Sequence, residues 1–282
     1  MPTSSENPTC APRAPEPSPI RAVSDLILAA GALPARTLVI PGGDRPEDLR
    51  LVESARDHGI VARCVLVGHG PAIRDAARMV GIELAADDVV WTGDAEQTAA
   101  RTAEFIRSGQ VDVVLKGNIS TPVLNRQMVR IRTRPTVSLV TLCDAAPIAA
   151  GRPFLFTDPG VTTVCDRQRL EGLIRNAIEV ARHVLRIDRP RVALLAANEK
   201  VIPSLPSTVL AEELAELDWP DADVYGPLSF DLAMSPESVR LKRLPATGPA
   251  AAVAGRADVL VCPGIDTANV LCHCEDPIEA AR

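Results

Sequence analysis

Residues 111–118 read Val-Asp-Val-Val-Leu-Lys-Gly-Asn. The first five residues are nearly all apolar and mostly β-branched, which is typical of a parallel strand that is covered on both faces. Lys116, Gly117 and Asn118 follow directly, so a charged and flexible segment lies where this strand would end. Upstream, short β-branched runs alternate with segments of helical periodicity, and this alternation predicts an α/β fold with a doubly wound sheet.

The same alternation can be followed along most of the chain. Strands are predicted at 36–40, 61–67, 88–91 and 111–115, and helices at 45–58, 71–80 and 95–108. Near residue 135 the pattern changes, because the apolar runs 136–142 and 153–157 have only a short polar gap between them, which indicates a hairpin or a crossing into a second domain. Helices at 166–186, 208–217 and 236–243 and strands at 191–196 and 257–262 are predicted after it.

We therefore expect two α/β domains, at residues 21–135 and 136–282. They follow a tail at residues 1–20 that is rich in Pro, Ser and Glu, and this tail is predicted to be disordered because it has too little apolar surface to offset its ordering entropy.

The composition excludes several classes of partner. The chain has 282 residues, 46% of them hydrophobic, and a formal net charge of −6, so nucleic acid and anionic membrane surfaces are not expected partners. No apolar stretch approaches the roughly 20 residues that a membrane span needs. The seven scattered cysteines imply no disulfide framework, which favours a reducing cytoplasm.

The first candidate site is the segment from Lys116 to Pro122. Gly117 lets the backbone approach a ligand closely, and Thr121 before Pro122 has the form of an N-cap followed by proline at the first helical position. A helix N-terminus with a lysine beside it can bind an anion. The alternative is that Thr121 only caps a helix and that Lys116 is a solvated strand end; the spacing alone favours neither.

Three further polar side chains follow predicted strands or begin helices. Asp158 could orient a ligand or accept a proton, but Asp before Pro-Gly is also a common turn former, and this second interpretation is favoured. Asp231 lies in an apolar context and needs a partner such as Lys242 or an arginine, so it could be only a structural ion pair. Asn269 can both donate and accept, which suits a phosphate or an amide group.

A metal site is not predicted. The run Cys272-His273-Cys274 lacks the second pair of ligands that a zinc site needs.

Taken in order, several segments resemble one family. They are VDVVLKGNIST, FTDPGVTTVCD, RVALLAANEKVIPSLPSTVLAEEL, YGPLSFDLAMSPESVRLKR and GRADVLVCPGIDTANVL, with ARCVLVGHGPAIRDAARMVGIEL upstream of them. The chain resembles the phosphate acetyltransferase/phosphate butyryltransferase family, most closely its phosphate butyryltransferase branch. The resemblance runs from about residue 25 to about residue 275.

This resemblance implies two doubly wound α/β domains with an active cleft between them, as in the isocitrate/isopropylmalate dehydrogenases, and usually a homodimer. The reaction it implies is acyl-CoA + phosphate ⇌ acyl phosphate + CoA, with acyl-CoA and phosphate as substrates and no metal or cofactor. The expected substrate-binding residues are Lys116, Gly117, Asn118, Thr121, Asp158, Asp231 and Asn269.

The sequence departs from the family pattern near its end. In the family the Asn segment is followed by a helix, a strand and a Ser-Arg motif with an acidic residue close behind, and no Ser-Arg occurs in this chain. Ala268, His273 and Thr162 also stand where the family has Gly, Lys and Asn. We therefore expect a first domain without its completing segment, a catalytic residue that cannot be named from this chain, and impaired turnover.

Two other functions remain as alternatives. One is a non-catalytic homologue that binds CoA or phosphate and acts through a partner. The other is a dehydrogenase on the same fold, which is disfavoured because the metal-binding aspartates and the late nucleotide-binding segment of those enzymes are not found.

Overall fold

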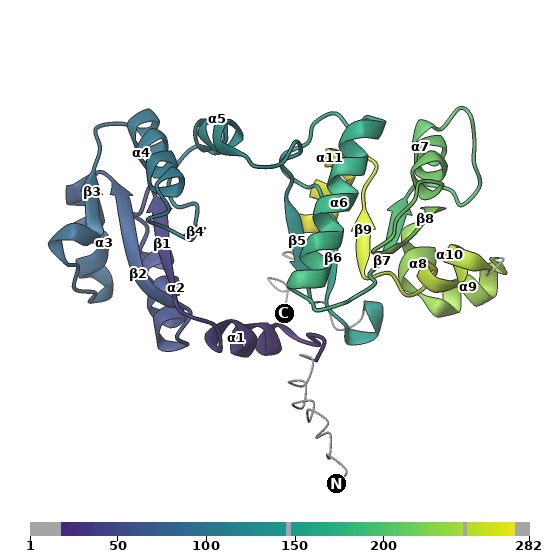
Figure 1. Cartoon of the computed structure of the whole chain (residues 1–282), viewed down its shortest axis with the longest axis horizontal. Helices are drawn as coiled ribbons and strands as arrows, with labels where there is room; N and C mark the ends of the chain where they lie inside the picture. Colours follow the sequence, from purple (N-terminus) through teal and green to yellow (C-terminus); the bar gives the residue numbers. More distant parts are fainter. Residues whose placement is uncertain (1–17, 145–147, 245–246, 274–282) are drawn as a thin grey trace, which may run out of the picture.

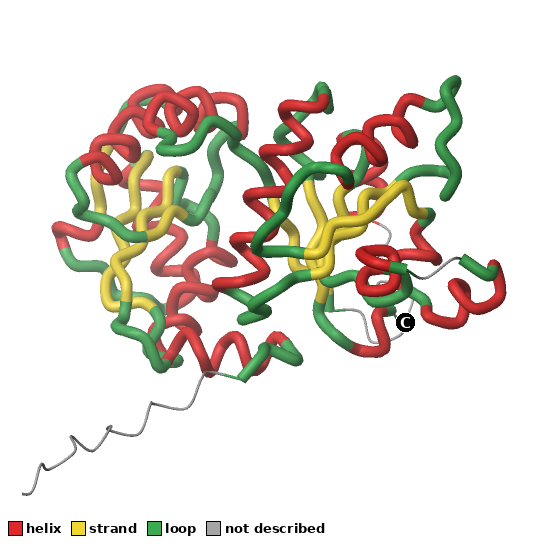
Figure 2. Tube along the Cα trace, turned by 45° about the vertical axis from the view of Figure 1, so that its right-hand side comes forward, coloured by secondary structure: helices red, strands yellow, loops and turns green. Residues whose placement is uncertain are grey.

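The computed structural model describes residues 18–144, 148–244 and 247–273, and its strands form two separate sheets. Helices cover both faces of each sheet, as Figures 1 and 2 show. The predicted fold class, with two doubly wound α/β units, is confirmed. The exact boundary between residues 135 and 136 stays a prediction, and the two sheets lie on either side of it.

The first sheet has four parallel strands in the order β3-β2-β1-β4. They are β1 (Arg36–Pro41), β2 (Val61–Gly68), β3 (Val89–Trp91) and β4 (Val113–Val114). Along β1, Leu38 and Ile40 face the helices α2 (Pro46–Asp57) and α3 (Gly70–Val80), while Val39 between them faces α4 (Ala95–Arg107). Helix α5 (Thr121–Ile131) packs on α4 through a small third cluster. The period-two alternation of a strand thus accounts for the two cores.

The second sheet has five strands in the order β5-β6-β9-β7-β8, and only the pairing of β5 with β6 is antiparallel. The strands are β5 (Val140–Cys143), β6 (Phe154–Thr157), β7 (Arg191–Leu195), β8 (Asp223–Leu228) and β9 (Val259–Val261). The change of pattern after residue 135 reflects both predicted possibilities, because β5 and β6 pair in antiparallel fashion and both belong to the second sheet.

Each face of this second sheet has its own helices. One face is covered by α6 (Arg167–His183) and α7 (Pro206–Ala215), and the other by α8 (Phe230–Met234), α10 (Gly248–Val253) and α11 (Ile265–His273). Helix α9 (Pro236–Lys242) follows α8 directly.

The N-terminal part of the described chain packs first on the second unit and then leads into the first. Ile20 is 8% exposed, packs in the core of the second unit and donates its backbone N–H to the carbonyl of Leu185. Helix α1 (Val23–Gly31) then runs toward the first sheet. Residue 20 therefore differs from the disordered tail predicted for residues 1–20, whereas residues 1–17 lie outside the described residues.

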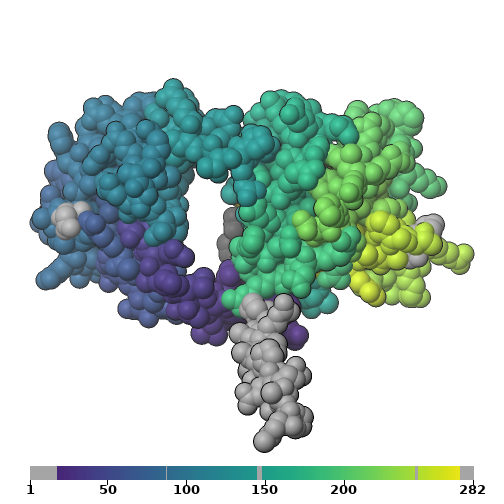
Figure 3. All heavy atoms as spheres, in the orientation of Figure 1, coloured from purple at the N-terminus to yellow at the C-terminus, as the bar shows by residue number. Residues whose placement is uncertain are grey.

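Two connections bridge the units, and an opening lies between them. Helix α1 closes the opening along one side, and the segment after α5 closes it along the other (Figure 3). The second connection is fixed to α6, because the amide of Asn176 donates to the carbonyl of Thr136 at 3.1 Å and to Ser138 Oγ at 2.8 Å. An opening between two α/β units is a common position for a ligand site.

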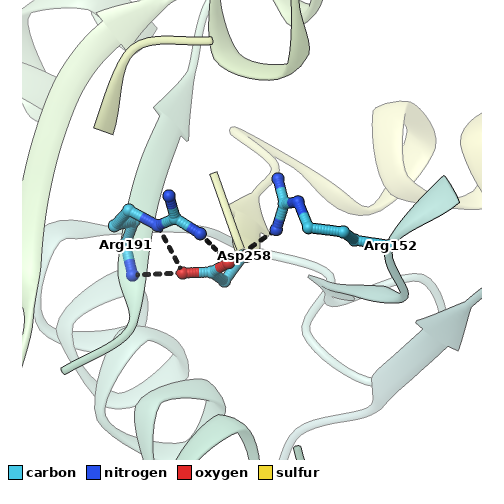
Figure 4. A network of polar contacts seen from close by, with 3 residues as sticks. All are labelled: Arg152, Arg191 and Asp258. Carbon is cyan, nitrogen blue, oxygen red and sulfur yellow. Dashed lines mark hydrogen bonds and ion pairs between the residues drawn. The ribbon is translucent and has the colours of Figure 1, made fainter. Parts of the chain in front are cut away.

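A buried carboxylate ties together the starts of three strands in the second sheet (Figure 4). Asp258, only 1% exposed, accepts hydrogen bonds from Arg152 Nη1 at 2.9 Å and from Arg191 Nε at 2.8 Å and Nη2 at 2.6 Å. The backbone N–H of Arg191 donates to it as well, at 3.0 Å. A buried charge of this kind is tolerated because it is paired and fully hydrogen-bonded.

Candidate functional site

The loops that follow β1 and β4 contact each other so closely that both need glycine. A Cβ atom on Gly117 would lie 2.3 Å from the carbonyl oxygen of Gly42, and one on Gly42 would lie 2.4 Å from the Asn118 backbone. Gly42 also has a φ of +74°, in the left-handed region that favours glycine. Backbone hydrogen bonds from Gly117 to Pro41 at 3.1 Å and from Asn118 to Gly42 at 2.6 Å hold the two loops together. Gly117 was predicted to let the backbone approach a ligand closely. In the structure, its lack of a side chain lets the loop after β1 lie against it.

The side chain of Asn118 bridges two residues of the β1 loop. Its Oδ1 atom accepts from Arg45 Nη2 at 3.4 Å, and its Nδ2 atom donates to Asp44 Oδ2 at 3.4 Å. Lys116, two residues earlier, is exposed, and its Nζ atom makes only a 3.4 Å contact with the neighbouring Gly117 carbonyl. Lys116 is therefore available to an anion that arrives from solvent.

A cavity of about 190 Å³ opens at the carboxyl ends of all four strands of the first sheet. Its wall comes from the loops after these strands and from the start of α4, namely Gly42, Asp44, Gly68, His69, Thr92, Gly93, Asp94, Ala95, Thr98, Asn118 and Ile119. Open α/β sheets bind their ligands at this edge. Asn118 is the one predicted site residue in the wall.

The predicted capping role of Thr121 is wrong by one residue. Ser120 occupies the N-cap position of α5, without a capping hydrogen bond from its side chain, while Thr121 is the first helical residue and Pro122 the second. Proline is tolerated at the second helical position as well, because the backbone N–H groups of the first helical residues have no intrahelical acceptor. Thr121 is exposed, three residues beyond Asn118.

In the second unit, Asp158 is used by its own loop. It is 2% exposed, and its carboxylate accepts backbone N–H bonds from Gly160, Val161 and Thr162, each at 3.0 Å. These bonds fit the turn-forming interpretation. A direct contact of Asp158 with a ligand stays a prediction.

Asn269 lies beside this loop. It is exposed on α11, and its Nδ2 atom donates to the Pro159 carbonyl at 3.2 Å. The structure thus brings two predicted site residues, Asp158 and Asn269, onto one loop-and-helix junction after β6 and β9.

Asp231 lies apart from this junction, in the short helix that follows β8. It accepts from Ser229 Oγ at 2.7 Å and pairs with Lys242 Nζ at 2.9 Å. Hydrogen bonds from Lys242 and Ser229 lower the pKa of the Asp231 carboxyl. The predicted pairing with Lys242 is confirmed, but the expected burial is wrong, because the Asp231 side chain is 43% exposed.

The predicted residues therefore fall into separate groups. Lys116, Gly117, Asn118 and Thr121 lie at the carboxyl edge of the first sheet, and Asp158, Asn269 and Asp231 lie after strands of the second. Within the described residues, the side-chain hydrogen bonds of each group stay within its own unit.

The sequence analysis missed Asp44, Arg45, His69 and Asp94 at the first group. The signal was available, because Gly42-Gly43-Asp44 follows a strand and precedes a helix, as Lys116-Gly117-Asn118 does. Two oxygen atoms here are buried and lack a hydrogen bond, Asp44 Oδ1 and Asp48 Oδ2. Burial raises the pKa of the Asp48 carboxyl, while the nearby charges of Arg45 and Lys116 act to lower it.

A larger cavity of about 670 Å³ lies between residues 132–140 and α6, and several of its polar side chains are already engaged with one another. Arg134 pairs with Glu179, and the Asn176 amide bonds the backbone and side chains of the facing segment. We therefore place the candidate site at the edge of the first sheet.

The part of the chain that the structure describes has neither a cluster of metal-binding side chains nor a membrane-spanning helix. Within residues 18–144, 148–244 and 247–273 there is no group of three or more His, Cys, Asp or Glu side chains that could hold a metal ion. The same residues include no helix with the length and apolar character needed to span a membrane.

Comparison with known proteins gives consistent matches. Residues 94–274 match the family described as phosphate acetyl/butaryl transferase. A phosphate butyryltransferase of Clostridium acetobutylicum is 28% identical, with 89% of this chain and 83% of that protein covered. A phosphate acetyltransferase of Rickettsia felis is 29% identical, with 88% and 71% covered.

Solved structures agree with these matches. The crystal structure of a branched-chain phosphotransacylase from Enterococcus faecalis is 32% identical and superposes with a TM-score of 0.68, with 83% of this chain and 82% of that chain covered. A phosphotransacetylase from Streptococcus pyogenes, 19% identical with a TM-score of 0.69 and coverage of 92% and 87%, shares the fold.

Proposed function

Because the chain belongs to the phosphate acetyl/butaryl transferase family, we propose that it moves an acyl group between coenzyme A and inorganic phosphate. The family match over residues 94–274 carries this proposal, and the names of the relatives support it. A phosphate oxygen attacks the thioester carbonyl carbon, the carbon–sulfur bond breaks, and the products are an acyl phosphate and CoA, whose sulfur takes up a proton. The reaction needs neither an oxidant nor a reductant.

The candidate site offers part of what this chemistry needs. The attacking phosphate is an anion, and a cation that is not engaged elsewhere helps to concentrate and orient it. The exposed ammonium of Lys116 at the carboxyl edge of the first sheet supplies such a charge.

The direct test is release of the CoA thiol from acetyl-CoA and butyryl-CoA. Release that depends on added phosphate, with formation of the matching acyl phosphate, is the expected result. If no thiol is released at micromolar protein while calorimetry shows that CoA binds, the non-catalytic binding homologue is the correct function instead.

Variants of Lys116 link the activity to this edge of the sheet. Lys116→Met is expected to raise the KM for phosphate about tenfold, the loss typical of one charge-assisted hydrogen bond, whereas Lys116→Arg keeps the charge and most of the affinity. Arg36→Ala removes a cation at the opposite end of β1, where Arg36 is half-exposed and lies 3.6 Å from Asp112, and serves as the control. Equal KM values for Lys116→Met and Arg36→Ala would contradict the assignment of this edge as the phosphate site.

We propose a homodimer that works in the cytoplasm with acyl-CoA and phosphate as its only small-molecule partners, without a bound cofactor or metal and without nucleic acid. The net charge of −6 supports the last of these. Analytical ultracentrifugation tests the dimer, and activity that survives dialysis against a chelator tests the independence from metal.

A further inference from the structure

Arg45 is an unassigned cation at the edge of the site. It occupies the N-cap position of α2, is exposed, and its side chain makes no capping hydrogen bond. Its Nη2 atom instead donates to Asn118 Oδ1 at 3.4 Å. Among the described residues it takes part in no ion pair that the structure shows, in contrast to Arg36 at the other end of β1, which lies near Asp112.

The amide of Asn118 has one orientation that satisfies both of its neighbours. Its nitrogen donates to the Asp44 carboxylate at 3.4 Å, which leaves its oxygen toward the Arg45 guanidinium. A guanidinium has five N–H donors, so one long bond to Asn118 leaves most of them for a ligand. This bond orients the Arg45 guanidinium without forming an ion pair.

Arg45 and Lys116 lie near the same partly buried carboxyl, that of Asp48. The charges of both act on Asp48, although the two cations come from different loops, one after β1 and one after β4. The hydrogen bond from Asn118 to the Gly42 carbonyl at 2.6 Å fixes the two loops against each other. Among the described residues neither cation forms an ion pair, and two such cations on adjoining loops at the carboxyl edge of a parallel sheet suit an oxyanion with several acceptor atoms.

We propose that Arg45 is a substrate-contacting residue that binds a phosphoryl oxyanion together with Lys116, and that Asn118 is the positioning residue that holds the Arg45 guanidinium in place. This inference rests on the proposed function and changes the predicted role of Asn118, which acts through Arg45 and not by touching the substrate. The phosphoryl group belongs either to free phosphate or to the diphosphate of CoA.

A double-mutant cycle in the thiol-release assay tests the positioning role. Arg45→Ala is expected to raise the KM for the phosphoryl substrate about tenfold with little change in kcat, because it removes ground-state and transition-state binding alike. Asn118→Ala raises the same KM by a smaller factor, and it adds nothing to Arg45→Ala in the double variant. Independent, multiplying effects would overturn the positioning role. Arg36→Ala is the matched control.

Two conservative variants sharpen the result. Asn118→Asp keeps an acceptor for Arg45 but places a carboxylate against the guanidinium, so it is expected to raise KM as much as Arg45→Ala does. Arg45→Lys keeps the charge without the planar fork and is expected to restore part of the affinity. If Asn118 had only a structural role, Asn118→Ala and Asn118→Asp would lower the melting temperature equally, and KM would not depend on the charge at position 118.

Calorimetric titrations separate the two ligand sources and do not require turnover. If free phosphate is the ligand, Arg45→Ala weakens the binding of inorganic phosphate and spares CoA; if the CoA diphosphate is the ligand, the reverse holds. Unchanged binding of both ligands, or a wild-type chain that binds neither, would overturn the assignment of Arg45. A wild-type chain that binds either ligand normally but does not release thiol would overturn the proposed function alone.

Discussion

Asp258 shows at the residue scale how the second unit is held together. It is buried between two guanidinium groups and accepts four hydrogen bonds, one of them from the backbone. Removing one partner of a buried ion pair leaves the other charge uncompensated, so Asp258→Asn is expected to lower the free energy of unfolding by about 3 kcal/mol. Urea unfolding measures this loss.

The control for this prediction is Asp223→Asn. Asp223 also accepts from an arginine, Arg189, at 2.9 Å, but the pair lies near the surface, with side chains 52% and 26% exposed for Arg189 and Asp223. Its loss is expected to stay below about 1 kcal/mol. Equal losses for the two variants would show that burial is not what makes the Asp258 network important.

At the scale of single elements, two strand regions carry buried thiols with altered ionisation. Burial raises the pKa of Cys64 in β2 and of Cys262 after β9 from 9.0 to about 12. The folded state therefore favours the neutral thiol, and this contribution to stability is complete below pH 9 and is lost as the pH rises toward 12.

The measurement is the melting temperature between pH 8 and pH 11. The wild type is expected to lose stability over this range more steeply than Cys64→Ala or Cys262→Ala, each compared with its own value at pH 8. Because lysine and tyrosine titrate in the same range, the difference between the curves, and not the slope of one curve, is decisive. Parallel curves would contradict the burial effect.

Much of the element order could be predicted from periodicity, and the failures have physical causes. Strand β8 was not predicted because Gly226 and Pro227 interrupt its apolar run, yet it is the outermost strand of its sheet, where a proline does not break a ladder of hydrogen bonds. The strand predicted at 136–142 begins only at Val140, because residues 136–138 bond the side chain of Asn176 instead.

The candidate site could be predicted only in part. A glycine and polar residues at a strand end indicate the carboxyl edge of a parallel sheet, and this signal located Lys116 and Asn118. It could not show that Asn118 faces Arg45 and Asp44, because those contacts depend on how the two loops lie in space. For the same reason Asp158 could not be separated from a turn former by its sequence alone.

At the scale of the whole molecule, the two sheets have separate apolar cores. Leu173 lies in one core of the second unit and Ile73 in one core of the first, and both are 0% exposed. We expect calorimetry to show more than one unfolding transition. Leu173→Ala and Ile73→Ala should each lower a different transition, with a loss of about 2–5 kcal/mol for the unit concerned. A single transition that both variants shift equally would show that the units unfold together.

The position of Ile20 has a consequence for the order in which the molecule takes shape during synthesis. All strands of the first sheet come from residues 36–114, so that sheet can be completed early as the chain leaves the ribosome. Ile20 was made before any of them, but the core cluster in which it packs also contains Leu155, Leu185 and Val259. The segment at the start of the described chain thus remains exposed to solvent until nearly all of the protein has been translated, and it is among the last parts to pack.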